Sequence, residues 1–195
     1  LPVYEREIPR GKFMPWNAAV DQLGWHVLCM AEYAARNDWF IGLKNPKWVG
    51  ESLARANNAD FDGETTMEKT WKGLAHYAAI TKGKNILIHR GVDVSEKGTY
   101  RNAPVHEIAK RVKRDTGAAL YFDPSHSYGP KMREDIVPAT IEAMKMQGED
   151  GAYLYDGILI EAGTSKTDTE QHISISELGD LVKDLASIRG LVCRK

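Results

Sequence analysis

The sequence predicts an α/β protein and, within that class, a (β/α) barrel. Three observations support this: short apolar runs alternate with amphipathic helical patterns, the runs lack the polar alternation of half-buried strands, and each run ends in a charged or titratable residue. Functional groups at the carboxyl ends of successive parallel strands are typical of barrels. An open doubly wound sheet also binds ligands there, but the sequence contains no GxGxxG or GxxxxGK[ST] loop after a strand. The barrel is therefore favoured.

The strands are predicted where β-branched and aromatic residues gather in short runs. Such runs suit strands that are buried on both faces of a parallel sheet. The predicted strands are 39–44 (WFIGLK), 85–91 (NILIHRG), 119–126 (ALYFDPSH) and 157–163 (GILIEAG).

Helices are predicted between these strands because parallel strands need long crossover connections. One pattern starts at Pro104 and stops at Gly117, and another has Ser174 and Glu177 at the spacing of a capping box. The predicted helices are 67–80, 104–117, 133–146 and 174–188, and residues 25–34 (WHVLCMAEYA) read as a further buried helix.

Length and composition fit a single domain over residues 1–195. The 26 basic and 27 acidic residues leave a net charge of −1 without a basic tract, which argues against nucleic acid and against a polybasic membrane patch. No run approaches the length of a membrane span, and Cys29 and Cys193 form no disulfide framework, so we expect a cytoplasmic protein. The first residue is Leu1 rather than Met, so we expect a processed or cut start.

Two of the strand ends carry cations. Lys44 and Arg90 follow apolar residues, where an unpaired charge is costly, so each needs an anion. A substrate phosphate or carboxylate would serve, and the fork of Arg90 suits a phosphate. The alternative is an internal ion pair, either Lys44 with Glu161 or Arg90 with Asp123.

The other strand ends carry a possible metal site. His126, Glu161 and Asp168 offer one imidazole and two carboxylates, a set that suits a divalent Mn, Fe, Co or Zn ion. The alternative is structural: Glu161 and Asp168 are then a strand-end acid and a loop residue, and Asp123 only caps the next helix.

Several segments resemble the 3-deoxy-7-phosphoheptulonate (DAHP) synthase family, which includes the 3-deoxy-octulosonate 8-phosphate synthases. ILIHRG, FDPSHSYG and GILIEAGTSKTDTEQHIS are similar to its sixth, seventh and eighth strand–loop segments, and GLKNP to its fifth. The resemblance covers about residues 39–185 and implies the C-terminal half of a TIM-type barrel, about strands 4 to 8, in an N-terminally incomplete chain. LPVY would then be the end of the fourth strand.

The resemblance implies an enzyme that condenses phosphoenolpyruvate with an aldose phosphate, with erythrose 4-phosphate favoured because of the DPSH tetrapeptide. Lys44 and Arg90 would bind phosphoenolpyruvate and, with His126, act in catalysis. Lys97 and Arg101 would contact the phosphate of the sugar, or would belong to a solvated loop.

The resemblance also implies that His126, Glu161 and Asp168 bind the divalent metal, with Asp123 contacting substrate or the metal's surroundings. The family's cysteine ligand on the first strand and its basic pair on the second have no counterpart here. A second reading is therefore a non-catalytic or split-barrel module that binds phosphate ligands and is completed by another chain. A metal-dependent lyase or hydrolase is a third. Trp16, Asn17 and Trp25 either line the mouth or only pack the loop.

A half barrel would leave unpaired sheet edges and an uncovered apolar face. We therefore expect the chain alone to self-associate or aggregate, and we expect a homo-oligomer. The inward side chains expected to stay wet are Ile41, Leu43, Ile86, Ile88, Leu120, Phe122 and Leu159.

Overall fold

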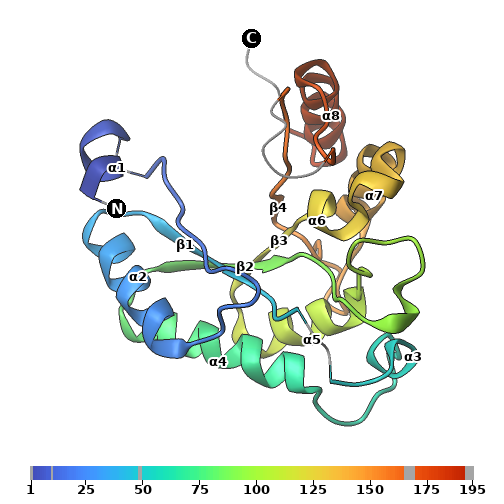
Figure 1. Cartoon of the computed structure of the whole chain (residues 1–195), viewed down its shortest axis with the longest axis horizontal. Coiled ribbons are helices and arrows are strands. Elements are labelled where there is room, and N and C mark those ends of the chain that lie inside the picture. Colours follow the sequence, from blue (N-terminus) through green and yellow to red (C-terminus); the bar gives the residue numbers. More distant parts are fainter. Residues whose placement is uncertain (1, 10, 48–49, 165–169, 192–195) are drawn as a thin grey trace.

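The computed structural model describes residues 2–9, 11–47, 50–164 and 170–191, and its centre is a parallel sheet (Figure 1). The four strands have the order β1-β2-β3-β4, and each pairs in parallel with the next. This confirms the predicted α/β class. The strands are β1 (Phe40–Lys44), β2 (Lys84–His89), β3 (Ala119–Phe122) and β4 (Gly157–Ile158).

β1 and β2 are each one residue shorter than predicted, and the other two strands are much shorter. β3 ends at Phe122 because Asp123 caps the helix α6 (Pro124–Tyr128), whose first residue is a proline. β4 has only two residues, and the chain leaves the sheet after the Leu159 N–H donates to the carbonyl of Phe122 at 2.8 Å. Both strands therefore deliver their polar residues from loops and a helix start, beyond the sheet itself.

Three helices cover one face of the sheet (Figure 1). They are α2 (Gly24–Arg36), α4 (Thr66–Ile80) and α5 (His106–Thr116). A capping box of Thr65 and Glu68 starts α4, and Gly117 ends α5 in the left-handed conformation with φ of 64°. The predicted helices 67–80 and 104–117 are thus confirmed.

A smaller core joins the last helices. α7 (Ile136–Lys145) begins three residues later than predicted, because the 3-10 turn η2 (Pro130–Asp135) precedes it. The capping box of Ser174 and Glu177 starts α8 (Ile175–Ile188) as predicted. The remaining elements are α1 (Pro2–Glu7), α3 (Leu53–Ala56) and η1 (Ser95–Lys97), and the small core contains Ile136, Ile173 and Leu181.

The expectation of wet inward side chains is wrong for most of the residues concerned. Leu43, Leu120 and Phe122 belong to the core shared with the helices. Ile88 is also fully buried, because its Cδ1 lies against Gly42, where a Cβ would come within 2.6 Å of it. Ile41 and Ile86 are buried as well, and only Leu159 keeps intermediate exposure.

The segment beside β1 also differs from expectation. Pro2–Glu7 is helical, so LPVY does not end a strand in the described residues 2–4. Instead, Trp16 forms a parallel bridge with Gly42, whose N–H donates to the carbonyl of Pro15 at 2.8 Å. The chain around Trp16 therefore occupies the edge position next to β1.

The helix predicted over residues 25–34 is confirmed, but it is buried on one face only. Val27, Ala31 and Ala34 point into the core, whereas Trp25 is 60% exposed and Cys29 is exposed. Cys193 lies outside the described residues. In the described ranges, no helix combines the length and apolar character that a membrane span requires.

Candidate active site

The carboxyl ends of β1, β2 and β3 bring the predicted strand-end residues to one edge of the sheet. Lys44 is the last residue of β1, Arg90 follows β2, and Asp123 follows β3. Because Lys44 pairs in register with Ile88, Arg90 extends two residues further along the neighbouring strand. Lys44 and Arg90 are each only 6% exposed, and Asp123 only 1%. Three ionisable groups are therefore buried together at the barrel mouth.

Lys44 is paired internally, but not with the predicted Glu161. Its Nζ lies 3.5 Å from Oδ2 of Asp123 and 5.4 Å from the centre of the Trp16 ring. Burial lowers the pKa of Lys44, and the charge of Asp123 opposes this effect only in part. Lys44 is therefore a buried cation whose counter-charge offsets only part of the cost of its burial.

Arg90 has no such partner among the described residues: neither a hydrogen bond nor an ion pair reaches its guanidinium, and Asp123 pairs with other groups. Burial lowers the pKa of Arg90, as does the nearby charge of Arg101, although Asp123 raises it. A buried guanidinium without a close acceptor is costly in a folded protein, and an anionic ligand would remove that cost.

Arg90 lines a cavity of about 340 Å³ that is rich in cations. Lys47, Lys97 and Arg101 line the same cavity. Asp93 binds both lysines: its carboxylate lies 2.9 Å from Nζ of Lys47 and forms a short ion pair with Lys97. These contacts lower the pKa of Asp93. Four cations around one acid give this cavity a net positive charge suited to a phosphate group.

Asp123 also organises His126. Its Oδ1 accepts a hydrogen bond from the His126 backbone N–H at 3.0 Å and lies 3.1 Å from the ring Nδ1. Its Oδ2 lies 2.9 Å from Nδ1 and 3.5 Å from Nζ of Lys44, but at angles that make no hydrogen bond. Burial raises the pKa of Asp123, yet the hydrogen bond and charge of His126 and the charge of Lys44 outweigh it and leave the pKa below its usual value.

Glu161 lies on the other side of His126. Its Oε1 is 3.4 Å from Nδ1 of His126, and its Oε2 is 3.6 Å from Nε2 of His172 and 2.9 Å from the Gln171 amide nitrogen. The structure thus brings together His126 and Glu161, two of the three predicted metal ligands. Asp168, the third, lies outside the described residues.

The donor atoms at this place fit a divalent metal in part. A metal-binding imidazole commonly donates one ring N–H to a carboxylate, as His126 Nδ1 does to Asp123, and this leaves Nε2 for a ligand. Within the described ranges, no hydrogen bond reaches Nε2, and no group of three or more His, Cys, Asp or Glu side chains is arranged to hold a metal. Of the predicted ligands, the described residues therefore supply the imidazole of His126 and the carboxylate of Glu161.

Sequence reasoning missed Lys47, Asp93 and His172. The first two each lie three residues beyond a predicted strand-end cation, in the loops that build a barrel mouth. Counting forward from each strand end would have found them. Nothing in the sequence pattern separates His172 from an ordinary polar residue before a helix.

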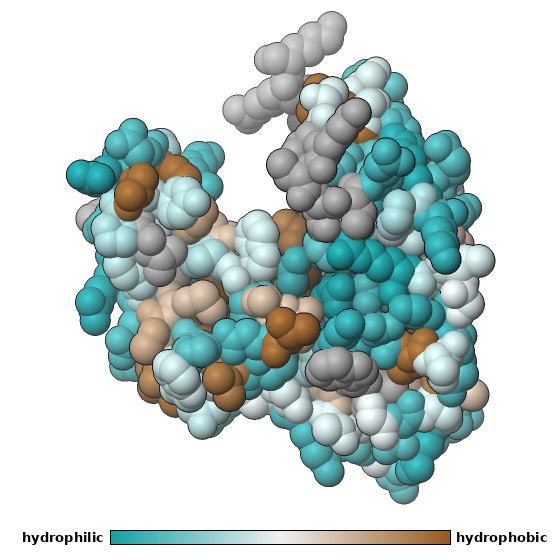
Figure 2. Space-filling view, in the orientation of Figure 1, coloured by the Kyte–Doolittle hydropathy of each residue, from teal (hydrophilic) through white to brown (hydrophobic). Residues whose placement is uncertain are grey.

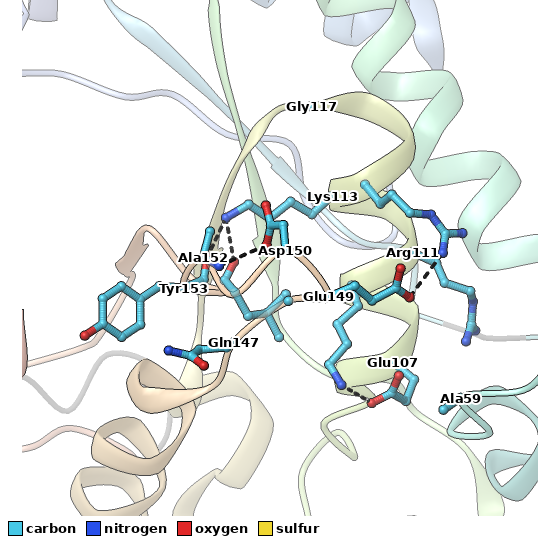
Figure 3. A pocket seen from close by; sticks show the side chains of 14 residues that line it. Ala59, Glu107, Arg111, Lys113, Gly117, Gln147, Glu149, Asp150, Ala152 and Tyr153 are labelled. Carbon is cyan, nitrogen blue, oxygen red and sulfur yellow. Dashed lines mark hydrogen bonds and ion pairs between the residues drawn. The ribbon is translucent and has the colours of Figure 1, made fainter.

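A larger cavity of about 680 Å³ lies between α5 and residues 147–154 (Figure 3). Its cations already have protein partners: Nζ of Lys113 donates to the carbonyls of Tyr153 and Leu154, and Lys110 pairs with Glu107. Three acids line it beside four cations, whereas a single acid lines the cavity beside Arg90, so it is less suited to an anionic ligand. Figure 2 shows a broad hydrophilic surface over the centre and right of the molecule.

Comparison with known proteins gives matches only at the level of structure. No protein-family model matches the chain, and no curated protein matches its sequence. Phospho-2-dehydro-3-deoxyheptonate aldolase (DAHP synthase) from Thermotoga maritima is similar with a TM-score of 0.67 and 18% identity, over 97% of this chain and 48% of that chain. A truncated form of 3-deoxy-D-arabino-heptulosonate 7-phosphate synthase from Thermotoga maritima is similar with a TM-score of 0.65 and 19% identity, over 98% and 63%.

The chain thus spans between about half and just under two thirds of the length of these structures. The predicted barrel class and the predicted resemblance are confirmed at the level of the fold. The chain has the fold of part of a DAHP synthase barrel.

Proposed function

We propose that this chain carries the phosphoenolpyruvate-binding and metal-binding part of an active site that condenses phosphoenolpyruvate with an aldose phosphate. The product would be a 3-deoxy-ulosonate phosphate, and erythrose 4-phosphate is the favoured aldose. The observation that carries the proposal is the burial of Lys44 and Arg90 at adjacent strand ends, with Arg90 lacking an acceptor among the described residues.

In this proposal, Lys44 and Arg90 bind the phosphate and carboxylate of phosphoenolpyruvate. Their burial strengthens the attraction, because charges interact more strongly away from water. The cavity with Lys97 and Arg101 would take the phosphate of the sugar. Carbon 3 of phosphoenolpyruvate then forms a bond with the aldehyde carbon, water adds to carbon 2, and inorganic phosphate leaves.

A divalent Mn, Fe, Co or Zn ion would be held by His126 and Glu161, with Asp168 as the third ligand, and would polarise the aldehyde. Asp123 would keep His126 in one tautomer and orientation, since it accepts from both the ring and the backbone N–H. We propose a cytoplasmic homo-oligomer that binds neither nucleic acid nor membrane.

A phosphate-binding module that needs a second chain for catalysis is the second candidate. The observation that favours it is that residues 1–195 contain no counterpart of the cysteine ligand and the basic pair that the family carries on its first two strands. Binding of phosphoenolpyruvate without its consumption would be the signature of this candidate.

The experiment is a calorimetric titration of the chain with phosphoenolpyruvate, followed by an assay of its consumption with erythrose 4-phosphate and Mn²⁺. Lys44→Met and Arg90→Met should each weaken binding by about tenfold or more, because each removes a charge-assisted contact. Arg114→Met is the matched control, since that side chain is 57% exposed on α5. Equal affinity in all four proteins, or no binding by the unmodified chain, would contradict the proposal.

A further inference from the structure

At three strand ends the backbone N–H of the charged residue donates to a side chain from an earlier part of the barrel, whereas the Asp123 N–H after β3 donates to the carbonyl of His89 at 2.8 Å. Three bonds of this kind repeat around the sheet, and none of them belongs to a regular strand ladder. The bonds run from Lys44 N to Asn17 Oδ1 at 2.8 Å, from Arg90 N to Asn45 Oδ1 at 2.7 Å, and from Glu161 N to Ser125 Oγ at 3.0 Å.

Asn17 takes the place of a neighbouring strand at the end of β1. Its Oδ1 accepts from Lys44 N–H while its Nδ2 lies 3.4 Å from the carbonyl of the same residue. Nδ2 also donates to the carbonyl of Asp21 at 3.0 Å, so the loop after Trp16 fixes the amide in place. Asn17 is 1% exposed. Its buried amide therefore fixes the peptide from which the Lys44 side chain projects.

Asn45 does the same for the next strand. Its Oδ1 accepts from Arg90 N–H, and its Nδ2 donates to the carbonyl of Gly91 at 3.0 Å and to that of Pro46 at 2.8 Å. The side chain is fully buried. Because β2 ends at His89, these bonds continue the pairing beyond the sheet and hold the Arg90 backbone between them.

Ser125 acts at the far end of the sheet. Glu161 lies three residues beyond the end of β4, where its carbonyl accepts from the Ile173 N–H at 3.0 Å and, among the described residues, its own N–H donates to Ser125 alone. Ser125 is fully buried on α6 and directly precedes His126. Its bond to Glu161 N–H therefore connects the backbone of Glu161 to the helix that carries His126.

We propose that Asn17, Asn45 and Ser125 are positioning residues that set the places of Lys44, Arg90 and Glu161 at the mouth. Their role in the reaction rests on the proposed function. A strand end without such a bond frays, and a displacement of about 1 Å is enough to lower the activity of a well-ordered site. Each buried bond would therefore increase ligand affinity by holding the backbone of the binding residue in place.

The test uses Asn17→Ala, Asn45→Ala and Ser125→Ala, each with a control of the same residue type. Asn37→Ala is the control for the asparagines, since Asn37 is 6% exposed and its Nδ2 donates to the carbonyl of Tyr33 at the end of α2. Ser127→Ala is the control for Ser125, because Ser127 is fully buried on the same helix but bonds the carbonyl of Asp123.

Two measurements are made on each protein: exchange of the individual backbone amides, and calorimetric titration with phosphoenolpyruvate and with inorganic phosphate. We expect the Lys44 amide to exchange about tenfold faster or more in Asn17→Ala, the Arg90 amide in Asn45→Ala, and the Glu161 amide in Ser125→Ala. We expect affinity for phosphoenolpyruvate to fall about fivefold or more in both asparagine variants, while the controls stay within about twofold.

Unchanged exchange at the named amide would overturn the proposal. So would a loss of phosphoenolpyruvate affinity in Asn17→Ala and Asn45→Ala that is no greater than the loss in Asn37→Ala, provided that the variants have the same melting temperature. If the unmodified chain binds neither phosphoenolpyruvate nor phosphate, the proposed function fails, and the exchange rates alone decide whether the three side chains hold these backbones. Ser125→Ala removes one hydrogen bond and little volume, so it keeps the test decisive where an asparagine variant does not fold.

Discussion

Nδ1 of His89 lies 2.7 Å from the hydroxyl oxygen of Tyr155, and both side chains are completely buried. Because the Val105 N–H donates to Nε2 of His89 at 3.2 Å, the ring proton resides on Nδ1 and is donated to Tyr155. The Tyr155 hydroxyl then donates to Nδ1 of His106 at 2.6 Å. The chain of hydrogen bonds is complete only while both imidazoles are neutral.

This arrangement predicts a loss of stability in mild acid. Burial, followed by the charge of Lys110, lowers the pKa of His106 to about 4, and burial lowers that of His89 well below its usual value, while Glu107 opposes the shift at His106. The unfolded chain therefore binds protons near pH 6.5 that the folded chain excludes. The stabilisation is fully present above about pH 6.5 and is lost as the pH falls toward 4, with His106 contributing on the order of 3 kcal/mol.

His106→Gln should weaken this pH dependence, since an amide oxygen accepts from Tyr155 without titrating. The free energy of unfolding, measured by urea at pH 7 and pH 4.5, should fall by about 2 kcal/mol less than in the unmodified chain. His76→Ala changes an exposed histidine and should leave the dependence intact. Identical pH profiles for all three proteins would show that His106 titrates normally.

We expect Arg90→Met to weaken ligand binding without lowering the free energy of unfolding. The guanidinium is buried, and burial lowers its pKa, so the folded protein disfavours the charge that a ligand would use. A methionine of similar length removes that cost, and the free energy of unfolding should stay equal or rise by about 1 kcal/mol. Urea denaturation measures this. A loss above about 2 kcal/mol would mean that Arg90 is a structural cation instead.

Asp123 and Lys44 should be energetically coupled. Asp123→Asn leaves a buried ammonium without its counter-charge and should cost about 2–4 kcal/mol. In the double variant with Lys44→Met the loss should be smaller than the sum of the single losses by about 1–2 kcal/mol. A urea-based double-mutant cycle measures this difference. Strict additivity would show that the 3.5 Å approach of Nζ to Oδ2 carries no net interaction.

Metal retention should depend on His126. His126→Ala removes the imidazole that Asp123 orients, so the bound Mn or Zn measured after dialysis should fall about tenfold or more. When a chelator has removed the metal from both proteins, the melting temperature of His126→Ala should lie only a few degrees below that of the unmodified chain, since His126 lies outside the hydrophobic core. The exposed His76→Ala serves as the control. Equal metal content in both variants would remove His126 from the ligand set.

The strand and helix types were predictable because they depend on local patterns. The runs that became β1 and β2 are apolar on both faces, and the capping residues of α4 and α8 stand at fixed spacings. Strand ends were less predictable. The apolar pattern alone suggested a longer strand, but Pro124 starts a helix that the Asp123 side chain caps, and this ends the strand at Phe122.

Partners across long sequence distances were not predictable. Lys44 pairs with Asp123 rather than Glu161, since Asp123 follows β3 directly whereas Glu161 lies beyond the short β4. The bond of His89 to Tyr155 joins residues 66 apart in the chain, and periodicity contains no signal for it. Such pairs follow from register, which two-residue alternation fixes only where one face is buried.

Self-association is predicted at an apolar surface made of Val20, Leu23 and Trp25, which are 68%, 49% and 60% exposed. The ring of Tyr77 packs against Gly24, so close that a Cβ there would lie 2.2 Å from it, and this holds the segment against α4. Figure 2 shows brown, apolar residues over the part of the molecule where Figure 1 places α2 and α4. Large apolar side chains grouped in this way mark interaction sites.

We expect sedimentation velocity to give a mean size that rises with protein concentration. The double variant Val20→Ser, Trp25→Gln should lower that size toward a monomer, because it removes two of the three apolar side chains without touching the core. Ile175→Ser is the control, since Ile175 is 65% exposed at the start of α8, away from this surface. A monomer at every concentration would contradict the prediction, and equal association in the double variant would place the contact elsewhere on the chain.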